Sequence, residues 1–453
     1  MDKHDILELF SLEDKDVLSC NYRNANGSAV IDIRLVPKYD PCPNCGSAHP
    51  KIKGYSRRVI NHGILTDRLC LINYDARRYQ CSACNRTYME KSPFSFGSSS
   101  ISPLTVQNVL RDLKNFNETF SSVAHRYHIS PTSAASIFDQ HVSIPRKPLP
   151  SIINFDEVYA FRHHSDKYVC VILDFQTSKP VDVLNSRRYD RLLSYFMQIP
   201  LEERKNVKAC CFDMYDTYRS IMHSCFPNAI GCVDHYHLSQ ELGRKIDAIR
   251  IRIMKGTRKG SDEYYLLKKF NWILYKPLDA SARNSKPLFD PNAPRKYNYH
   301  FKTDLNYYDI RNRLLSIDSE LADAWRLKDD MDDFYQKASD DTAEDLLAGL
   351  IKKFHSSAIE EMRHFAKTLN KWKVEIINSV HVYGYAYRID SSTGEVISRP
   401  VHLTNAIIEN RNSIIKCLKK NANGYRNWER FRNRILYVLD KDALPLLNPL
   451  KQK

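Results

Sequence analysis

The side chains that could perform chemistry in this sequence fall into two sets: acids that end predicted strands, and cysteines spaced in pairs. The run VKACCFDMYDTY (207–218) is apolar up to Asp213, which is typical of a buried strand. A buried carboxylate without a partner costs several kcal/mol, so Asp213 must be paired, hydrated or bound to a metal. Asp156 stands within another strand-like run, SIINFDEVYAF. Taken singly, each aspartate is most simply a capping or salt-bridged residue.

The elements around these acids predict that the two aspartates meet. From residue 150 the pattern gives three strands, a helix, the strand ending at Asp213, a second helix and a strand ending at Asp234. This is the order of an RNase H-like core, in which the first and fourth strands are neighbours. Asp156 and Asp213 would then face one another although 213 − 156 = 57 residues separate them.

Two adjacent carboxylates repel, and divalent cations relieve that repulsion best. Mg²⁺ takes a few carboxylates together with water and phosphate oxygens. Two such ions about 3.5–4 Å apart can activate a water or a 3′-hydroxyl and stabilise the leaving oxygen of a phosphodiester. We therefore predict Mg²⁺, or Mn²⁺ in its place, between Asp156 and Asp213.

The second set is two CxxC pairs, Cys42/Cys45 and Cys81/Cys84, which supply the four thiolates of a tetrahedral Zn²⁺ site. The segment between the pairs alternates as strands do, so we predict a zinc ribbon with a hairpin between its knuckles. Two unrelated cysteine pairs or a redox site are the alternatives. Cys70 and His49 could substitute for a ligand. The site has no open position, so its zinc would be structural.

Residues 103–142 predict short helices. Val106, Val109, Leu110 and Leu113 share one helical face, and a later helix ends at Tyr127 before a new one opens at Ser130 with a proline in its first turn. The pattern resembles a helix-turn-helix, and an ordinary helical hairpin is the alternative. Thr132 and Ser133 are its candidate DNA contacts.

Charge and composition favour a cytosolic protein that binds a polyanion. The 453 residues carry a net charge of +15. Residues 51–150 hold 14 Lys/Arg against 6 Asp/Glu, and residues 401–453 hold 11 against 4. Two separate basic blocks suggest two contacts with nucleic acid, although basic faces also serve solubility. We expect no membrane span, no export signal and no disulfide scaffold among the twelve cysteines.

After Asp234 the pattern is helical for a long stretch, and LTNAIIENRNSIIKCLKKNANGYRNWERFRNRIL follows near the end. Together with the CxxC pairs, FDEVYAF, FDMYDTY and DHYHL, this segment closely resembles the bacterial ISL-three family of insertion-sequence transposases, which are DDE-type enzymes. The resemblance covers roughly residues 38–440. Where the family usually brackets its glutamate with glycines, this chain has Ala406 and Asn410.

The resemblance implies a magnesium-binding catalytic triad of Asp156, Asp213 and Glu409. Asp234 and His237 match the family's Asp-x-x-His element and would support the site, as would Asn412 and Lys416. Glu409, Asn412 and Lys416 are spaced to share one face of a helix. The residues expected to bind DNA are Arg57, Arg58, Arg77, Arg78, Thr132, Ser133, Lys416, Arg426 and Arg434.

The expected fold class is α/β, an RNase H-like core interrupted by a helical insertion and preceded by the ribbon and the helix-turn-helix. The expected segments are 1–98 with the zinc ribbon, 99–148 with the helix-turn-helix, 149–240 with the first part of the core, 241–400 with the mostly helical insertion, and 401–445 with the last part of the core and the third acid.

The expected function is a transposase that binds terminal inverted repeats, cleaves a strand with Mg²⁺ and joins the 3′-hydroxyl to target DNA. Its partners would be double-stranded DNA and a second copy of the chain or more, and its location the bacterial cytoplasm, on the nucleoid when bound to DNA. A catalytically inactive, transposase-derived DNA-binding regulator is one alternative, and a structure-selective nuclease or resolvase with the same core is another.

Overall fold

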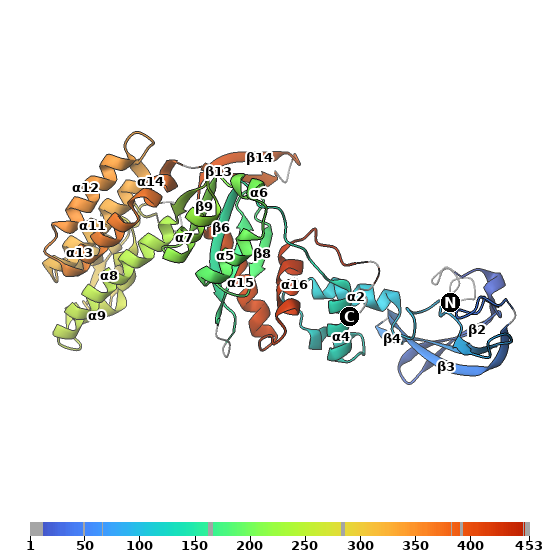
Figure 1. The fold of residues 1–453 in the computed structure, drawn as a ribbon. Helices are drawn as coiled ribbons and strands as arrows, with labels where there is room; N and C mark the ends of the chain where they lie inside the picture. Colours follow the sequence, from blue (N-terminus) through green and yellow to red (C-terminus); the bar gives the residue numbers. More distant parts are fainter. Residues whose placement is uncertain are drawn as a thin grey trace. The chain divides into compact units, whose positions relative to one another are not determined.

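The chain forms two compact units in the computed structural model, which describes residues 12–48, 50–65, 67–161, 166–281, 286–381, 383–389, 393–446 and 448 (Figure 1). Unit 1 comprises Met1–Pro145 and Ile414–Lys453, and unit 2 comprises Arg146–Ser413. The division between them falls inside helix α15 (Ala406–Asn421). Among the described residues, no helix combines the length and apolar composition needed to cross a membrane.

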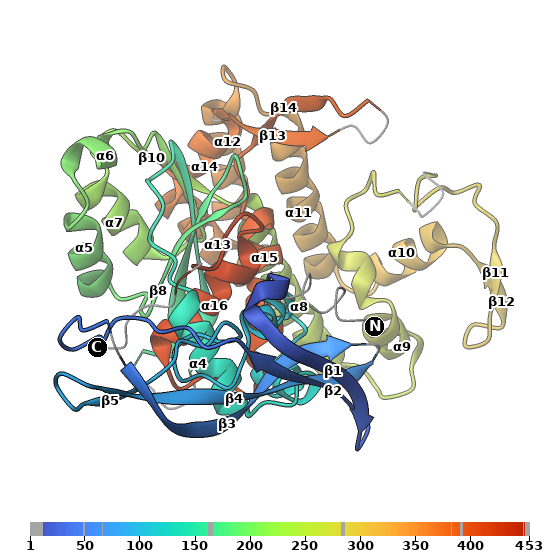
Figure 2. The same ribbon diagram turned by 90° about the vertical axis from the view of Figure 1, so that its right-hand side faces the viewer.

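Unit 1 opens with a short 3₁₀ turn, η1 (Asp14–Asp16), and a five-stranded sheet whose longest strands, β3 and β4, form a hairpin (Figure 2). The order is β1-β2-β4-β3, with β5 added beside β4, and β2 runs parallel to β4. The predicted hairpin between the two cysteine pairs is therefore confirmed. The strands are β1 (Val17–Ala25), β2 (Ser28–Leu35), β3 (Pro50–Leu65), β4 (Arg68–Cys81) and β5 (Thr87–Met89).

Three short helices follow this sheet, and each begins at a capping residue that the sequence supplies. The side chains of Ser102, Thr119 and Ser130 each accept a hydrogen bond from the backbone N–H three residues later. Two of the helices carry proline in the first turn, where its missing N–H costs nothing. The helices are α2 (Pro103–Leu113), α3 (Phe120–Arg126) and α4 (Pro131–His141).

The end of the chain completes the core of these helices. Helix α16 (Trp428–Leu439) places Tyr437 in the same apolar cluster as Leu110 and Phe138. The Tyr437 ring lies 5.9 Å from that of Phe138, and its hydroxyl donates to the Leu110 carbonyl at 3.2 Å. The segment expected as 401–445 is thus divided, since residues from Ile414 onward belong to unit 1.

Unit 2 is built on a mixed five-stranded sheet of order β10-β9-β6-β7-β8. Strands β6 and β9, the first and fourth of the predicted series, are parallel neighbours as predicted. Strands β9 and β10 are also parallel, whereas β6, β7 and β8 pair antiparallel. The strands are β6 (Ile152–Tyr159), β7 (Tyr168–Asp174), β8 (Pro180–Leu184), β9 (Ala209–Phe212) and β10 (Ile230–Val233).

The two faces of this sheet pack against different elements. Phe155 and Phe212 face a large apolar core formed with α5 (Tyr189–Met197), α7 (Asp216–Cys225) and α8 (His235–Gly256). Ile152, Ala209, Cys211 and Cys232, which alternate with the first set, face a smaller cluster containing Leu403 and Ile407. The second face is therefore covered by the chain at the start of α15.

The remainder of unit 2 is mostly helical, with two small hairpins. Helices α8, α11, α12 and α13 gather beside one another (Figure 1). A short helix, α6 (Leu201–Lys205), precedes β9. The other elements are α9 (Asp262–Lys269), η2 (Asn271–Tyr275), β11 (Lys296–Asn298), β12 (Thr303–Leu305), α10 (Tyr307–Leu315), α11 (Ser319–Lys337), α12 (Ala343–His355), α13 (Glu360–Lys371), α14 (Lys373–His381), β13 (Tyr383–Ile389) and β14 (Val396–His402).

Candidate functional site

The four predicted cysteines of unit 1 form one group whose sulfurs all lie within 4.8 Å of one another. Cys42 Sγ lies 3.7 Å from Cys84 Sγ, and Cys45 Sγ lies 3.5 Å from Cys81 Sγ. A tetrahedral zinc with Zn–S bonds of about 2.3 Å requires sulfur–sulfur distances near ~3.8 Å. The group therefore fits a closed, structural zinc site.

The two CxxC turns reach this geometry by the same local fold. The N–H of Gly46 donates to the Cys42 carbonyl at 2.8 Å, and the N–H of Asn85 donates to the Cys81 carbonyl at 3.0 Å. Gly46 has φ +72° and Asn85 has φ +57°, a left-handed conformation that glycine and asparagine tolerate best. The residue type after each pair thus allows both sulfurs to point at one position.

The backbone around Cys81 also favours a thiolate. The N–H groups of Cys84 and then Ala83 point at its sulfur and lower the pKa of the Cys81 thiol to about 6. Thiolate is the form that binds zinc. The alternative ligand Cys70 is a buried residue of the sheet's apolar core and lies outside this group. His49 lies outside the described residues.

In unit 2 the strand register brings the two predicted aspartates together. Ile152 pairs with Ala209, an offset of 209 − 152 = 57 residues, which is also the separation of Asp156 and Asp213. The Asp213 and Asp156 carboxylates form a group with Glu157 in which one oxygen of each lies within 4.8 Å of the others. The predicted meeting of Asp156 and Asp213 is therefore observed.

This group lacks sufficient positive charge, and a divalent ion fits it. Burial raises the pKa of Asp213 to about 7, and the Glu157 and Asp156 carboxylates add to the shift. The Asp213 Oδ1 atom is buried without a hydrogen-bond partner among the described residues. Burying an oxygen without a hydrogen bond costs free energy, and a bound hard cation would remove that cost.

Glu157 is the member of the group that the sequence-based prediction omitted. Arg187 forms an ion pair with its carboxylate, and the hydroxyl of the fully buried Tyr218 donates to it at 3.1 Å. The Arg187 guanidinium also lies over the Tyr168 ring, 4.0 Å from its centroid. The Glu157 carboxylate is therefore already paired. Its charge acts on Asp213, whose pKa it raises. The signal that could have identified it is the adjacent acid pair in FDEVY.

Helix α15 is fixed beside Asp156 by two buried asparagines. The Asn154 side chain donates to the Asn405 side chain at 2.9 Å, and Asn405 donates to the Phe155 carbonyl at 3.3 Å. The helix begins at the next residue. One and a half turns later, the buried Asn412 Nδ2 donates to Asp156 Oδ2 at 2.6 Å. Asn412, predicted as a supporting residue, is therefore in direct contact with the predicted metal ligand.

Glu409, the predicted third acid, lies in a different group from the two aspartates. Its ligand atom is within 4.8 Å of those of Asp234 and His237, and its Oε1 lies 3.9 Å from His237 Nε2. Asp234 is fully buried, caps helix α8, and has an Oδ2 atom without a hydrogen-bond partner among the described residues. The expected single group of three acids is therefore observed as an aspartate pair and a separate set containing Glu409.

Most of the predicted DNA contacts are accessible. Arg57, Arg78, Thr132, Lys416 and Arg426 are exposed. Two others, Ser133 and Arg58, are partly exposed and already have hydrogen-bond partners. The Ser133 and Ser130 hydroxyls share a hydrogen bond of 2.8 Å, and Arg58 donates to the carbonyls of Gly97 and Ser99.

The prediction that Arg77 binds DNA is wrong, because its side chain is buried. Its guanidinium pairs with the Glu90 carboxylate at 3.0 Å and donates to the carbonyls of Leu35 and Val36. Arg77 ties strand β4 to the end of β2 and cannot reach a phosphate. The available signal was the strand alternation, which places it on the same face as the buried Tyr79.

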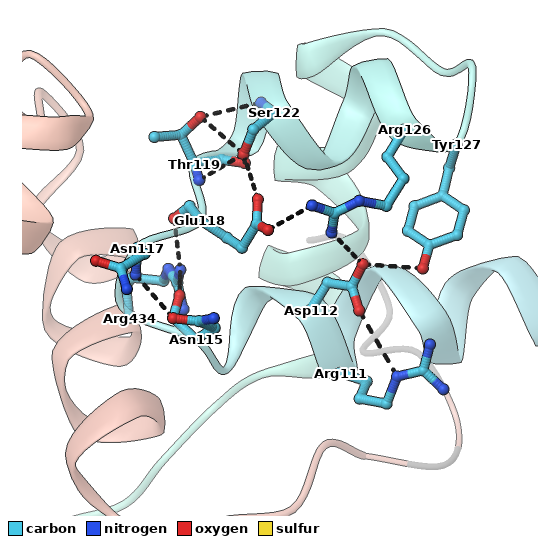
Figure 3. A network of polar contacts seen from close by, with 10 residues as sticks. All are labelled: Arg111, Asp112, Asn115, Asn117, Glu118, Thr119, Ser122, Arg126, Tyr127 and Arg434. Atoms are coloured by element: carbon cyan, nitrogen blue, oxygen red, sulfur yellow. Dashed lines mark hydrogen bonds and ion pairs between the residues drawn. The ribbon is translucent and has the colours of Figure 1, made fainter.

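The prediction that Arg434 contacts DNA is also wrong. Arg434 is fully buried in unit 1, and its Nη2 donates to the carbonyls of Asn115 and Glu118, at 3.0 and 2.9 Å (Figure 3). The Glu118 carboxylate pairs in turn with Arg126 of α3. Arg434 therefore stabilises the turn before α3. Its spacing of three residues from Phe431 and from Tyr437, both buried, predicts this position.

Comparison with known proteins defines the class. A transposase family model for the ISL3 group matches residues 153–435, and the model of the zinc finger of IS204, IS1001, IS1096 and IS1165 transposases matches residues 38–84. The chain belongs to the ISL3 family of transposases. The transposase for insertion sequence element IS1001 of Bordetella parapertussis is 20% identical over 409 residues, which cover 88% of this chain and 89% of that protein.

Proposed function

We propose that this protein is a DNA transposase that binds the terminal inverted repeats of an insertion sequence and catalyses metal-dependent strand cleavage and strand transfer. The observation that carries the proposal is the Asp156–Asp213 pair. Asp156 lies within β6 and Asp213 directly follows β9, the parallel neighbour of β6, and a buried oxygen of Asp213 has no partner among the described residues. A pair in this state favours a divalent cation.

Asp156 and Asp213 would hold Mg²⁺ or Mn²⁺, and Glu409 would be the third acid. Bound ions would supply activation of water or a 3′-hydroxyl and stabilisation of the leaving oxygen. Asn412 would orient Asp156 through their 2.6 Å hydrogen bond. Glu409 lies one helical turn before Asn412, so DNA binding would need only to move it from Asp234 and His237 toward the aspartates.

The architecture supports the same proposal. The sheet order β8-β7-β6-β9-β10, with the first and fourth strands adjacent and parallel, is the arrangement of an RNase H-like core. Helices α3 and α4, joined by a short turn at residues 127–130, would form the helix-turn-helix. Structural zinc would stabilise the ribbon, and the exposed basic side chains of unit 1 would contact phosphates.

The partners would be double-stranded DNA, both terminal inverted repeats and target, and at least one further copy of the chain. Two transposon ends must be joined in one reaction, which favours a dimer or a higher oligomer in the active complex. The site of action would be the bacterial cytoplasm, on the nucleoid. The five segments expected from the sequence, with the zinc ribbon, the helix-turn-helix, the two parts of the core and the helical insertion, remain our proposal for the domain organisation.

Strand cleavage of inverted-repeat DNA in the presence of Mg²⁺ tests the proposal. Asp213→Asn should lower the cleavage rate by more than about a hundredfold, since even outer-sphere partners of metal ligands are worth about 10–100-fold. Asp216→Asn, an exposed residue on helix α7, is the matched control and should cleave normally. An Asp213→Asn protein as active as the parent would refute the assigned role.

A catalytically inactive DNA-binding regulator is the second candidate, and one observation favours it. Glu409 lies with Asp234 and His237 rather than with the aspartate pair. If that arrangement persists on DNA, the catalytic set stays incomplete. Binding of inverted repeats without nicking under Mg²⁺ or Mn²⁺ would select this reading over the transposase.

A further inference from the structure

The β11–β12 hairpin of unit 2 exposes two tyrosines. Tyr299 is 88% exposed and Tyr297 is 53% exposed, and their rings lie edge to face with centroids 5.2 Å apart. Tyr299 is the most exposed of the large apolar or aromatic side chains in the described part of the chain. Because aromatic side chains lose favourable burial when left in water, such a pair marks a surface for a ligand.

The hairpin is fixed from its inner side. The His300 ring stacks on Tyr265 of α9, with centroids 4.0 Å apart and planes 8° apart, and its Nε2 lies 2.9 Å from Asp262 Oδ1. The Asn298 side-chain oxygen accepts hydrogen bonds from the N–H groups of His300 and Phe301. The tyrosines therefore project from an anchored turn, which lowers the entropy lost when a ligand binds.

Exposed lysines lie on this hairpin and on helix α9, which contacts the hairpin through the Tyr265–His300 stack. Lys296 and Lys302 lie on the hairpin, Lys268 and Lys269 end helix α9, and all four are exposed. None of the four forms an ion pair with an acid among the described residues, and Lys269 Nζ lies over the Tyr265 ring at 5.1 Å from its centroid. The nearby acids are Asp262, which is already bound to His300, Glu263 beside it in the first turn of α9, and Asp304, which pairs with Tyr297 in the strand register.

We propose that the Tyr297–Tyr299 pair is a stacking platform for unpaired bases of a single-stranded DNA segment, with phosphates held by the lysines of the hairpin and of helix α9. Aromatic side chains beside a basic surface bind single strands in this way, and the stacking is tolerant of sequence because every base has a π-face. The platform deepens the proposed function and rests on it in one respect, because cleavage of the two strands at offset positions of a transposon end would leave such unpaired bases. The lysines favour a polyanion over a protein partner.

The test measures binding of the full chain to inverted-repeat DNA with a single-stranded overhang, and to the same DNA with a blunt end. All proteins carry Asp213→Asn so that the DNA stays intact. Tyr299→Ala should weaken binding of the overhang DNA by about 5- to 150-fold, the loss expected of one base–aromatic stack. Binding of blunt DNA should stay unchanged, and Tyr299→Trp should restore overhang binding. Tyr189→Ala, an exposed tyrosine on α5, is the control and should have no effect.

The platform is overturned if Tyr299→Ala and the double variant Tyr297→Ala/Tyr299→Ala bind overhang DNA as tightly as their Asp213→Asn parent. It is also overturned if these variants lose blunt and overhang binding equally, since that result reports a general defect. Failure of the proposed function gives a different result from failure of the platform. If the proposed function is wrong, the protein without Asp213→Asn cleaves no DNA, whereas overhang binding that depends on Tyr299 is measured separately.

Discussion

The two groups of metal-ligand side chains in this molecule differ in how they are assembled. The cysteine group of unit 1 is complete, with four sulfurs at distances that match one tetrahedral ion. The carboxylates of unit 2 form two partial sets, one containing Asp156 and Asp213 and the other Glu409. The cysteines come from two tight turns of one hairpin, whereas the acids come from separate strands and a distant helix.

The difference is the one expected from the roles proposed for the two groups. A structural zinc site has only to close around its ion, because the binding free energy of the ion then contributes to folding. A phosphoryl-transfer site must admit a nucleic-acid strand and ions together, so part of its ligand set is delivered with the substrate. Asp213 Oδ1, which has no hydrogen-bond partner among the described residues, and the position of Glu409 beside His237 agree with this second proposed role.

Removing one cysteine should have the largest effect and should leave the carboxylate site untouched. Cys81→Ser should abolish tight zinc binding, because structural zinc contributes roughly 10–16 kcal/mol of apparent binding free energy in small zinc domains. Metal analysis should fall from about one zinc per chain to none, and the sheet of unit 1 should lose protection from proteolysis. Cys20→Ser, outside the cysteine group, should keep its zinc. Full zinc content in Cys81→Ser would contradict the assignment of the four cysteines as one zinc site.

Removing the asparagine that orients Asp156 should have an intermediate effect confined to the other site. Asn412→Ala should weaken Mn²⁺ binding in unit 2 by about 10–100-fold, the usual cost of losing an outer-sphere partner of a metal ligand. Titration of Mn²⁺ followed by electron paramagnetic resonance measures this, with zinc content as the internal reference. Asn410→Ala, exposed on the same helix, should bind Mn²⁺ normally. Equal affinities in the two variants would contradict the role of Asn412.

Arg434 and Arg426 allow a buried and an exposed arginine of unit 1 to be compared directly. They lie in the helical part of this unit, which is held by side-chain packing rather than by zinc. Arg434→Met should lower the free energy of unfolding by about 1–3 kcal/mol, because the carbonyls of Asn115 and Glu118 lose their donor. Arg426→Met, at an exposed position, should leave stability unchanged and weaken DNA binding. Thermal unfolding and DNA titration of both variants separate the two roles. Weaker DNA binding with normal stability in Arg434→Met would restore it as a phosphate contact.

The smallest expected effect is a pH dependence of unit 1 that does not involve zinc. Burial lowers the pKa of His62 from 6.5 to about 4, and its Nδ1 lies 3.0 Å from Ser102 Oγ, at the start of α2. The folded state therefore favours neutral His62, so this contribution is present above pH 6.5 and is lost as the pH falls toward 4. His62→Gln should flatten the stability profile in that window. An unchanged profile would exclude His62 as the source of the acid sensitivity.

The sequence predicted the parts of both sites that depend on local spacing. CxxC turns and strand-end aspartates are short patterns, and the strand order alone was enough to place Asp156 beside Asp213. Burial of Arg77 and Arg434 was not predicted, because their charge was weighed above the periodicity that places both among buried residues, and the sequence does not show which partners satisfy them. Arg77 finds Glu90, and Arg434 finds carbonyls more than 300 residues earlier in the chain.

The position of Glu409 could not be predicted for a different reason. Its family motif identifies the helix but not the rotation of the side chain, and Asp234 and His237 compete for it from the start of α8. The prediction that helix α15 lies beside strand β6 is confirmed by the hydrogen bond between Asn412 and Asp156. The Glu409 carboxylate, however, lies with Asp234 and His237.

The most direct test of the central claim is the position of Mn²⁺, from its anomalous scattering, in crystals of the protein bound to inverted-repeat DNA. We expect an ion within bonding distance of both Asp156 and Asp213, with the Glu409 carboxylate moved into the same site. An ion bound elsewhere, or Glu409 still held by Asp234 and His237 with DNA in place, would contradict it.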